Sequence, residues 1–444
     1  MNVFRKILCL AFFCFNVHSS TTILMDNEIE AYLMEEIVNP IKEALGYKSP
    51  ITVLVSSSRT FNAAATDSGN IIINVGAIEM CKDVSELIGI LAHEVAHIAG
   101  NHISTFISNN PDFMKAGLVT ILLGAAAAVL AGNPTPLAAG LAGGQQMSRG
   151  MALAKMRQKE NIADSKSTVA MKKLLWPVSA GFLSIHEKLG EKSAVYNVYE
   201  STHPTSQDRI AKFRQWNNEE SEKQFPEDKI KLIQKMQRKF LLIKEKIKAL
   251  TLSPSSDIVL ASTMAQKYAL AIFLYRQSHF KAALALTEEV MNSEMDDSFD
   301  PAYVAEIKSM ALIGLKKYKE AADFAYSFLK KARKNKVYRD LGIIYADAVV
   351  QGELGKSYYK QSIRILRKIL LKNKYEISAY NVLGKIYTLD GRYANASLCA
   401  AEVASMIGDY EMAAVHAKKA KNSSNDEILK REATDIINTR PQRE

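Results

Sequence analysis

The chain has 444 residues, of which 48 % are hydrophobic and 23 % are charged, and its formal net charge is +10. This length exceeds one average domain, so two or three globular domains are expected. The lysines and arginines are spread through helical patterns and form no basic cluster interleaved with aromatic residues, which argues against a nucleic-acid partner. Peripheral contact with an anionic membrane surface is compatible with the charge.

The N-terminus has the layout of a secretory signal peptide over residues 1–19. Residues 1–6 are basic, residues 7–15 are almost wholly apolar, and small or modest side chains follow at a cleavable junction. The apolar stretch is short for a bilayer span, and an uncleaved anchor is the alternative. Two of the four cysteines would leave with this segment, and the remaining pair makes no disulfide framework. We therefore expect an exported protein that does not rely on disulfides.

Hydrophobic periodicity then predicts a helix over 26–45 and two strands, over 51–56 and 70–75. Short strands followed by a further helix suggest a small sheet packed on helices, an α+β arrangement. A sheet edge beside an active site can hold an extended peptide by strand addition. The candidate substrate-binding residues on this reasoning are Asn70, Ile71, Ile72, Ile73 and Asn74.

Residues 93–97 read His-Glu-Val-Ala-His and follow an apolar pattern with helical spacing over 84–92. On a helix, His93 and His97 project from one face, where two imidazoles can bind one zinc ion. Glu94 lies on an adjacent face, close enough to take a proton from a water molecule that the metal polarises. The pattern predicts a hydrolytic metal centre, although other divalent metals fit the same ligand types.

A catalytic zinc site needs a third protein ligand. His102 follows Gly100, but it lies nine residues after His93, one fewer than in zincins with a third histidine past a glycine. Glu160 is the better candidate, because it shares a helix face with Asp164. One carboxylate can bind zinc while the other accepts the N–H of a ligating histidine.

Between these two parts of the predicted metal site lies an apolar segment, residues 116–144. Its first stretch, residues 116–132, has seventeen residues and no charge, which is the lower limit for crossing a bilayer. Helices over the active site that touch a membrane surface are the preferred interpretation, and a transmembrane hairpin is the alternative. Further on, residues 216–256 are highly charged and are predicted to form a linker helix.

An irregular repeat follows over residues 257–437. An aromatic residue precedes a small residue by three positions at four places: Phe280 and Ala283, Tyr318 and Ala321, Tyr359 and Ser362, and Tyr393 and Ala396. The last copy has the pattern of a tetratricopeptide repeat. Stacked helix pairs of this kind build concave grooves for polypeptides, and a generic helical solenoid is the alternative.

Several motifs together resemble the CaaX-prenyl-protease/HtpX superfamily of zinc metalloproteases. They are the 93–97 motif, the pattern Arg157, Glu160, Ala163 and Asp164, and Thr202-His203-Pro204 followed by Arg209-Ile210. Residues 62–65 and 69–76 are similar to the family's strand hairpin, and residues 176–190 to its next helix. The order of segments resembles the periplasmic BepA-like branch. The implied fold is an α+β zincin-type metallopeptidase domain, mostly helical with a small β-sheet, followed by an all-α tetratricopeptide-like solenoid.

The resemblance also implies roles for individual residues. It assigns one Zn2+ ion to His93, His97 and Glu160. The general base would be Glu94, and Asp164 and Arg157 would support the ligands.

The resemblance also bears on His203 and Ser167. His203 occupies the family's His-Pro position near the metal, where it either steadies the oxyanion of the transition state or closes the site as a fourth ligand. Ser167 stands where the family usually has a glycine. This departure removes no ligand and no proton-transfer group.

The predicted organisation is a signal peptide (1–19), a metallopeptidase domain (20–215), a linker helix (216–256) and a repeat domain (257–437). The implied function is that of a zinc endopeptidase of the bacterial envelope. Its substrates would be misfolded or unassembled exported proteins, notably outer-membrane proteins, and its repeats could dock on the outer-membrane assembly machinery. The alternatives are a chaperone or assembly adaptor with a latent protease site, and a membrane-embedded protease.

Overall fold

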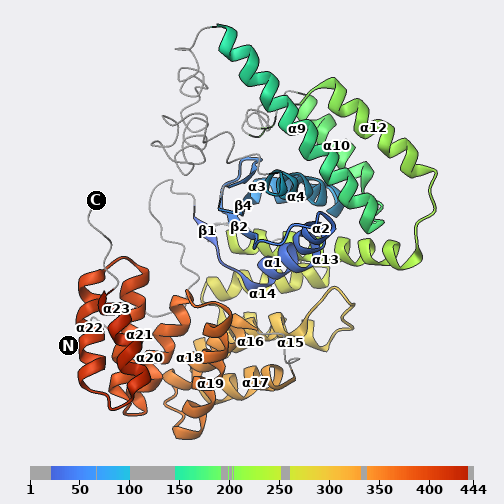
Figure 1. The fold of residues 1–444 in the computed structure, drawn as a ribbon. Coiled ribbons are helices and arrows are strands. Elements are labelled where there is room, and N and C mark those ends of the chain that lie inside the picture. The colour runs from blue at the N-terminus through green and yellow to red at the C-terminus, as the bar shows by residue number, and fades with distance from the viewer. Residues whose placement is uncertain are drawn as a thin grey trace. The chain divides into compact units, whose positions relative to one another are not determined.

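The computed structural model describes residues 22–66, 68–100, 146–191, 199, 203, 205–251, 261–331 and 338–438. The chain divides into two compact units, with the boundary after Thr251. Figure 1 colours the first unit from blue to yellow-green and the second from yellow to red. The predicted signal peptide, the apolar segment 116–144 and His102 lie outside the described residues.

The first unit contains a four-stranded mixed sheet in the order β1-β2-β4-β3. The strands are β1 (Ile23–Leu24), β2 (Thr52–Ser56), β3 (Ala63–Ala65) and β4 (Asn70–Asn74). Strands β2 and β4 are parallel, and β3 is antiparallel to β4. The two predicted strands are thus present as β2 and β4.

Strand β4 is an interior strand, because it pairs with β2 on one side and with β3 on the other. This corrects the expectation that Asn70–Asn74 form a sheet edge, since an interior strand has no free backbone groups for an added peptide. Among the described strands, the edge on this side of the sheet is β3.

The predicted N-terminal helix is a continuous helical segment in three parts, α1 (Asn27–Ala31), the π-helical η1 (Tyr32–Val38) and α2 (Asn39–Ala44). Asp26 caps its start by accepting hydrogen bonds from the N–H groups of Glu28 and Ile29. The π-helical stretch ends just before Pro40, which has no N–H to donate into the preceding turn and so favours a local change of helical pitch.

Helix α13 (Glu227–Thr251) belongs to the first unit. Its apolar side chains recur every three or four residues and are buried: Met236, Phe240, Ile243, Ile247 and Leu250. The segment predicted as a linker therefore packs as part of the first unit, together with α12 (Gln207–Ser221). Most of the charged side chains of this helix are exposed or half-buried, and Lys246 is buried.

A buried lysine fixes α13 to the start of the first unit. Lys246 is 1 % exposed, and its Nζ lies 2.9 Å from Asp26 Oδ2 and 3.0 Å from Glu28 Oε2. The Tyr32 hydroxyl donates a hydrogen bond of 2.9 Å to the carbonyl oxygen of Met236. These contacts join segments more than 200 residues apart in the sequence.

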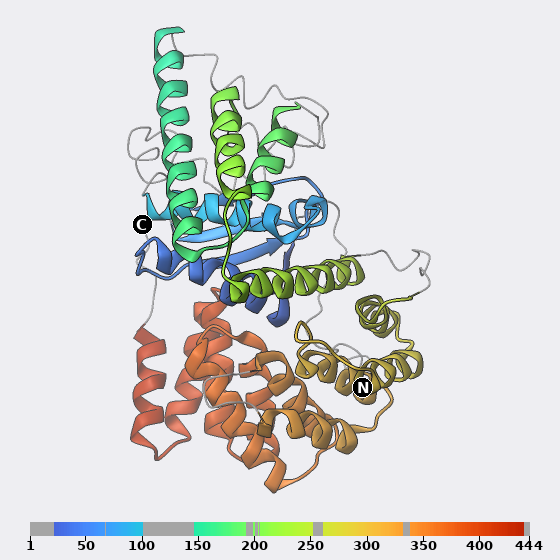
Figure 2. The same ribbon diagram turned by 90° about the vertical axis from the view of Figure 1, so that its right-hand side faces the viewer.

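Helix α4 (Val84–Ala99) is the predicted helix that carries the 93–97 motif. Asp83 caps it by accepting hydrogen bonds from the N–H groups of Ser85 and Glu86. Every residue from Glu86 to Ile98 is buried, because α9 (Gln146–Leu174), α10 (Ser179–Gly190), β3, η1 and α13 contact it. In Figure 2 the green helices α9, α10 and α12 rise from one side of α4. Helix α3 (Val75–Met80) follows directly on β4.

Helix α10 can approach α4 closely because it has a glycine at position 181. A Cβ there would overlap the Ser85 backbone and lie 2.5 Å from the Glu86 nitrogen. We expect Gly181→Ala to lower the free energy of unfolding by about 1–3 kcal/mol, since backbone atoms cannot move aside as side chains can.

Gly89→Ala is the matched control for this variant. The atoms nearest to its Cβ would be those of Phe182 at 3.5–3.6 Å, which is ordinary contact, and alanine favours a helix. We expect this control to be neutral or stabilising in a denaturant titration. Equal destabilisation of the two variants would contradict the account.

The described residues of the second unit form a succession of helices, each of which packs against the next. The helices are α14 (Met264–Arg276), α15 (Phe280–Asn292), α16 (Pro301–Gly314), α17 (Tyr318–Lys331), α18 (Arg339–Gln351), α19 (Lys356–Lys372), α20 (Ile377–Leu389), α21 (Tyr393–Met406), α22 (Tyr410–Asn422) and α23 (Glu427–Asn438). The four aromatic–small pairs fall in the first two turns of α15, α17, α19 and α21. Ala283, Ala321 and Ser362 are fully buried, as close helix packing requires.

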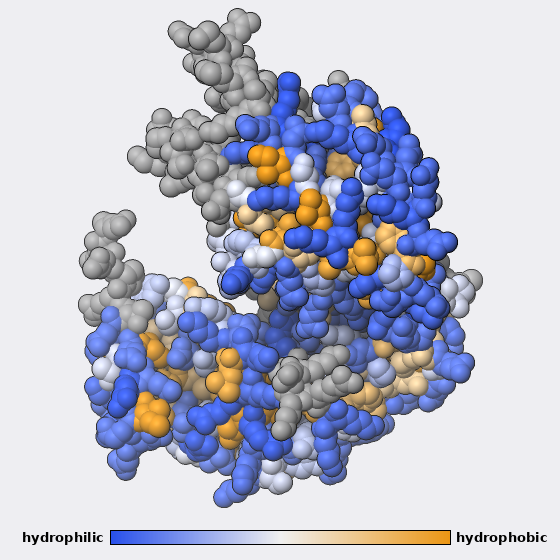
Figure 3. Space-filling view, turned by 45° about the vertical axis from the view of Figure 1, so that its right-hand side comes forward, coloured by the Kyte–Doolittle hydropathy of each residue, from blue (hydrophilic) through white to orange (hydrophobic). Residues whose placement is uncertain are grey.

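The surface in Figure 3 is mostly hydrophilic on both units, with hydrophobic side chains in small groups. Within the described ranges, no helix combines the length and the hydropathy needed to cross a membrane. Cys81 and Cys399 are both buried and unbonded to another cysteine. The described part of the chain is mostly helical and has one small mixed sheet, in the first unit.

Candidate metal centre and active site

Four side chains that can ligate a metal converge inside the first unit. His93 and His97 come from α4, Glu160 from α9, and His203 from the chain between α10 and α12. All four are buried, and one ligand atom from each lies within 4.8 Å of the others. The three ligands expected from the sequence and its resemblance are thus brought together, with His203 among them.

The distances between the ligand atoms match a single bound cation. His93 Nε2 lies 2.9 Å from His97 Nε2 and 3.1 Å from Glu160 Oε2, and His97 Nε2 lies 3.2 Å from Glu160 Oε1. Tetrahedral zinc with ligands at about 2.0–2.1 Å would set its ligand atoms about 3.3 Å apart. Imidazole nitrogens and a carboxylate are also the ligand types that zinc prefers. The residues present therefore fit one zinc ion.

His203 takes part in this cluster through Nδ1. That atom lies 3.3 Å from His93 Nε2 and 3.3 Å from Glu160 Oε1. The other ring nitrogen, Nε2, lies 3.5 Å from Glu94 Oε1. The Nδ1 atom of His203 therefore lies among the possible ligand atoms, and its Nε2 faces Glu94.

Glu94 lies beside the cluster and is fully buried. The Ala65 N–H of β3 donates a hydrogen bond of 2.9 Å to its Oε2, and the Tyr199 hydroxyl donates one of 3.4 Å to its Oε1. Burial raises the pKa of Glu94, and His203 and His93 oppose that rise. A carboxylate with a raised pKa is a better proton acceptor, which suits a general base.

Asp164 and Arg209 support the ligands. Asp164 Oδ1 lies 3.0 Å from His93 Nδ1, so His93 donates there and its Nε2 faces the cluster. Arg209, on α12, donates from Nε and Nη2 to the two oxygens of Asp164, at 2.6 and 2.9 Å. Its Nη1 lies 3.1 Å from Glu160 Oε2. Arg209 therefore orients Glu160 directly, and it orients His93 through Asp164.

The protonation of the cluster reflects two buried carboxylates among histidines. Burial lowers the pKa of His93, but Glu160 and Asp164 outweigh it and raise the pKa to about 10. Burial and the charge on His93 lower the pKa of His97 to about 3. Burial raises the pKa of Glu160, but His203 and His93 outweigh it and hold the pKa well below its usual range. The cluster thus favours one added positive charge, which a bound cation supplies.

His186 of α10 lies behind Arg209 and was not identified from the sequence. Its Nδ1 donates to the Phe182 carbonyl at 2.8 Å, which leaves Nε2 to accept from Arg209 Nη2 at 3.3 Å. Burial lowers the pKa of His186 to about 4, so the ring is neutral at pH 7 and can accept this bond. Neither His186 nor Tyr199 has a spacing relative to the 93–97 motif that would have revealed it, since both come from later segments.

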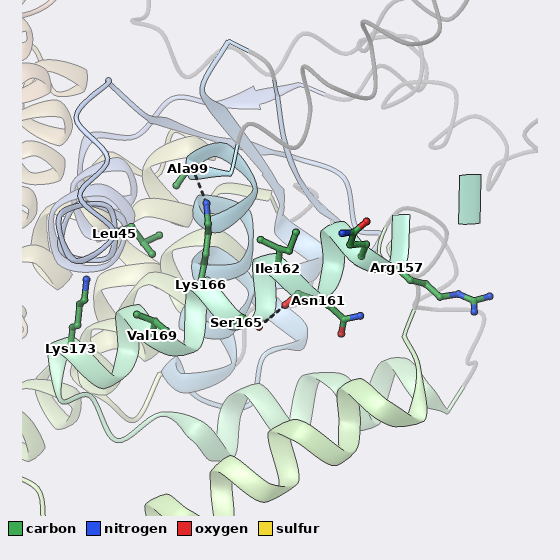
Figure 4. A pocket seen from close by; sticks show the side chains of 10 residues that line it. Leu45, Ala99, Arg157, Asn161, Ile162, Ser165, Lys166, Val169 and Lys173 are labelled. Atoms are coloured by element: carbon green, nitrogen blue, oxygen red, sulfur yellow. Dashed lines mark hydrogen bonds between the residues drawn. The ribbon is translucent and has the colours of Figure 1, made fainter. Parts of the chain in front are cut away.

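Arg157 does not reach the cluster. Its side chain is exposed, and in Figure 4 it points away from α9 at one end of a groove of about 780 Å3. Lys166 and Lys173 also line the groove, and they donate to the carbonyl oxygens of Ala99 and Ala44. None of the four metal-ligating residues lines it. The supporting role that the resemblance gave to Arg157 is filled by Arg209.

Ser167 fits the position where a glycine was expected. It is fully buried in α9, and its hydroxyl donates a hydrogen bond of 2.8 Å to the Asp164 carbonyl oxygen. The hydroxyl is therefore satisfied within the helix.

Residues 28–217 match the family model described as Peptidase family M48. The matched range contains the four residues of the metal cluster, Glu94, Asp164 and Arg209. A search of curated proteins found no match to the chain.

Proposed function

We propose that residues 28–217, a Peptidase family M48 domain, make this chain a zinc-dependent endopeptidase. The observation that carries the proposal is the convergence of His93, His97 and Glu160 with Glu94 beside them. Three protein ligands and an adjacent carboxylate are the parts that hydrolysis of a peptide bond requires.

In this mechanism His93, His97 and Glu160 hold the ion. Zinc bound there would polarise a water molecule and the scissile carbonyl group. Glu94 accepts the proton of the attacking water and delivers it to the leaving amine. The Ala65 N–H, at 2.9 Å from Oε2, keeps the Glu94 carboxylate directed at the site.

The peptide substrate would bind along β3 rather than β4. The N–H of Ala65 points away from β4 and toward Glu94, so the outer edge of β3 faces the active-site helix. No strand of the described residues pairs with that edge. An extended peptide added there would carry its backbone past Glu94 and the metal ligands.

We further propose that His203 closes the site. With Nδ1 at the ligand cluster, the imidazole occupies the position that a water molecule must take. The enzyme would then be active only in the fraction of molecules from which His203 has withdrawn.

The test is His203→Ala, measured as cleavage of casein by the purified chain with one equivalent of zinc. Minor conformations are commonly populated at about 0.1–10 %. If the open form has such a population, removal of the imidazole should raise kcat about ten- to thousandfold. A loss of activity, with zinc still bound, would instead make His203 a transition-state residue and refute the closure.

The biological setting that we propose is the bacterial envelope. The signal-like N-terminus supports export to the periplasm, and the helix pairs of the second unit support a tetratricopeptide-like platform. That platform would capture unfolded or unassembled outer-membrane proteins or dock on their assembly machinery. Carbonate extraction of membranes tests peripheral contact, since release of the chain rules out integral insertion.

The second candidate is an assembly adaptor with a mostly latent protease, and the position of His203 favours it. A rescue experiment separates the two functions. An adaptor would still function with Glu94→Gln and would fail without residues 257–437. A protease would fail with Glu94→Gln.

A further inference from the structure

A backbone hydrogen bond joins Tyr199 and His203, which are four residues apart in the sequence. The backbone N–H of His203 donates it, over 2.8 Å, to the Tyr199 carbonyl oxygen. The two rings are stacked, with centroids 4.5 Å apart and planes inclined by 30°. One face of the His203 imidazole is therefore covered by the Tyr199 ring.

The Tyr199 ring also packs against a second aromatic ring, that of Phe61. Phe61 meets it edge-on, with centroids 5.4 Å apart and planes at 89°. Phe61 is 1 % exposed and lies just ahead of β3, whose Ala65 hydrogen-bonds to Glu94. With Tyr199 3 % exposed, its ring cannot move away from His203 unless this packing opens.

The Tyr199 hydroxyl contacts Glu94, the proposed general base. It lies 3.4 Å from Glu94 Oε1, the same oxygen that faces His203 Nε2 at 3.5 Å. The other oxygen, Oε2, accepts from Ala65. In this arrangement both oxygens of Glu94 contact other groups of the protein: Oε2 contacts the Ala65 N–H, and Oε1 contacts Tyr199 and His203.

From these contacts we propose that Tyr199 is the positioning residue that holds the His203 imidazole at the metal cluster. Its ring, backed by Phe61, stacks on one face of the imidazole and holds the His203 ring beside the other ligand residues. The proposal rests on the proposed function, in which His203 closes a zinc site. It adds the element that sets how firmly the site is closed.

The expected effect follows from the strength of one aromatic contact. Such a contact shifts a two-state equilibrium about two- to tenfold. Loss of the Tyr199 ring should therefore raise the open fraction by that factor. Loss of the hydroxyl alone keeps the stack and should leave His203 in place.

The experiment uses the full chain with Co2+ in the metal site, because cobalt has visible absorption that reports its ligands. The variants are Tyr199→Leu, Tyr199→Phe and His203→Ala. We expect His203→Ala to change the spectrum, Tyr199→Leu to shift it toward that of His203→Ala, and Tyr199→Phe to match the wild type. Release of the metal to a chelator should be about two- to tenfold faster in Tyr199→Leu than in the wild type.

Two further variants distinguish the specific role of Tyr199 from a general loss of packing. Phe240→Leu removes a fully buried aromatic ring of α13 and should have the wild-type spectrum and release rate. Phe61→Leu weakens the support of the Tyr199 ring and should shift both readouts in the direction of Tyr199→Leu, which tests the proposal even if that variant does not fold.

The proposal is overturned if Tyr199→Leu and Phe61→Leu match the wild type while His203→Ala does not. It is also overturned if Phe240→Leu gives the same shift, or if His203→Ala leaves the spectrum unchanged. Casein cleavage by the zinc-loaded samples is scored separately. Absence of cleavage in every sample, including His203→Ala, would refute the proposed peptidase without altering the spectroscopic result.

Discussion

Replacement of Glu94 by glutamine is expected to slow peptide hydrolysis by about 10²–10⁴-fold, the usual contribution of a general base. The glutamine amide has nearly the same shape and can still accept the Ala65 N–H bond, but it cannot take a proton from water. Glu94 is not one of the metal-ligating residues. The bound metal should therefore remain at one equivalent per chain.

The measurement is cleavage of casein alongside metal analysis of the same preparation. Glu187→Gln is the matched control, because Glu187 is an exposed glutamate of the same unit and pairs only at the surface with Arg214. It should retain full activity. Undiminished cleavage by Glu94→Gln, in a preparation free of other proteases, would refute the assignment of the base.

Arg209→Leu should have the largest effect on stability. The guanidinium is 3 % exposed and contacts the carboxylates of both Asp164 and Glu160. Its removal takes away the guanidinium that pairs with these two buried carboxylates, and loss of one member of a buried ion pair typically costs about 3–5 kcal/mol of unfolding free energy. Because Asp164 then orients His93 poorly, metal affinity should also fall about 10–100-fold.

Denaturant titration of the metal-free chain and competition with a chelator measure these two losses. Arg209→Lys should be intermediate, since a lysine keeps the charge but cannot bond both oxygens of Asp164 at once. The control is Arg214→Leu on the same helix, whose exposed pair with Glu187 should contribute no more than about 1 kcal/mol. Similar losses in Arg209→Leu and Arg214→Leu would contradict the role assigned to Arg209.

The sequence predicted the elements and residues that depend on local pattern. Helix α4 follows from its apolar spacing, and His93 and His97 share a face because four residues make about one turn. The apolar positions of α13, at 236, 240, 243, 247 and 250, carried the signal that it packs in the first unit. The abundance of charge on the same helix concealed that signal.

The sequence did not predict which distant segments pack against one another. Strand β3 consists of three alanines, which have little preference for a strand, so hydrophobic periodicity did not predict it and only the resemblance of residues 62–65 to the family's strand hairpin indicated it. Asp164 could have been reached by Arg157 or by Arg209, and only the packing of α12 on α10 brings Arg209 to it. Tyr199 likewise becomes significant only through its stack on His203.

The most direct test of the metal-dependent peptidase is reconstitution of the stripped enzyme. The purified chain is freed of metal with a chelator, and casein cleavage is followed as zinc is added back. The account predicts that cleavage disappears on stripping and returns in full at one equivalent of zinc per chain. Cleavage that survives stripping, or a chain that binds no zinc at that stoichiometry, would contradict it.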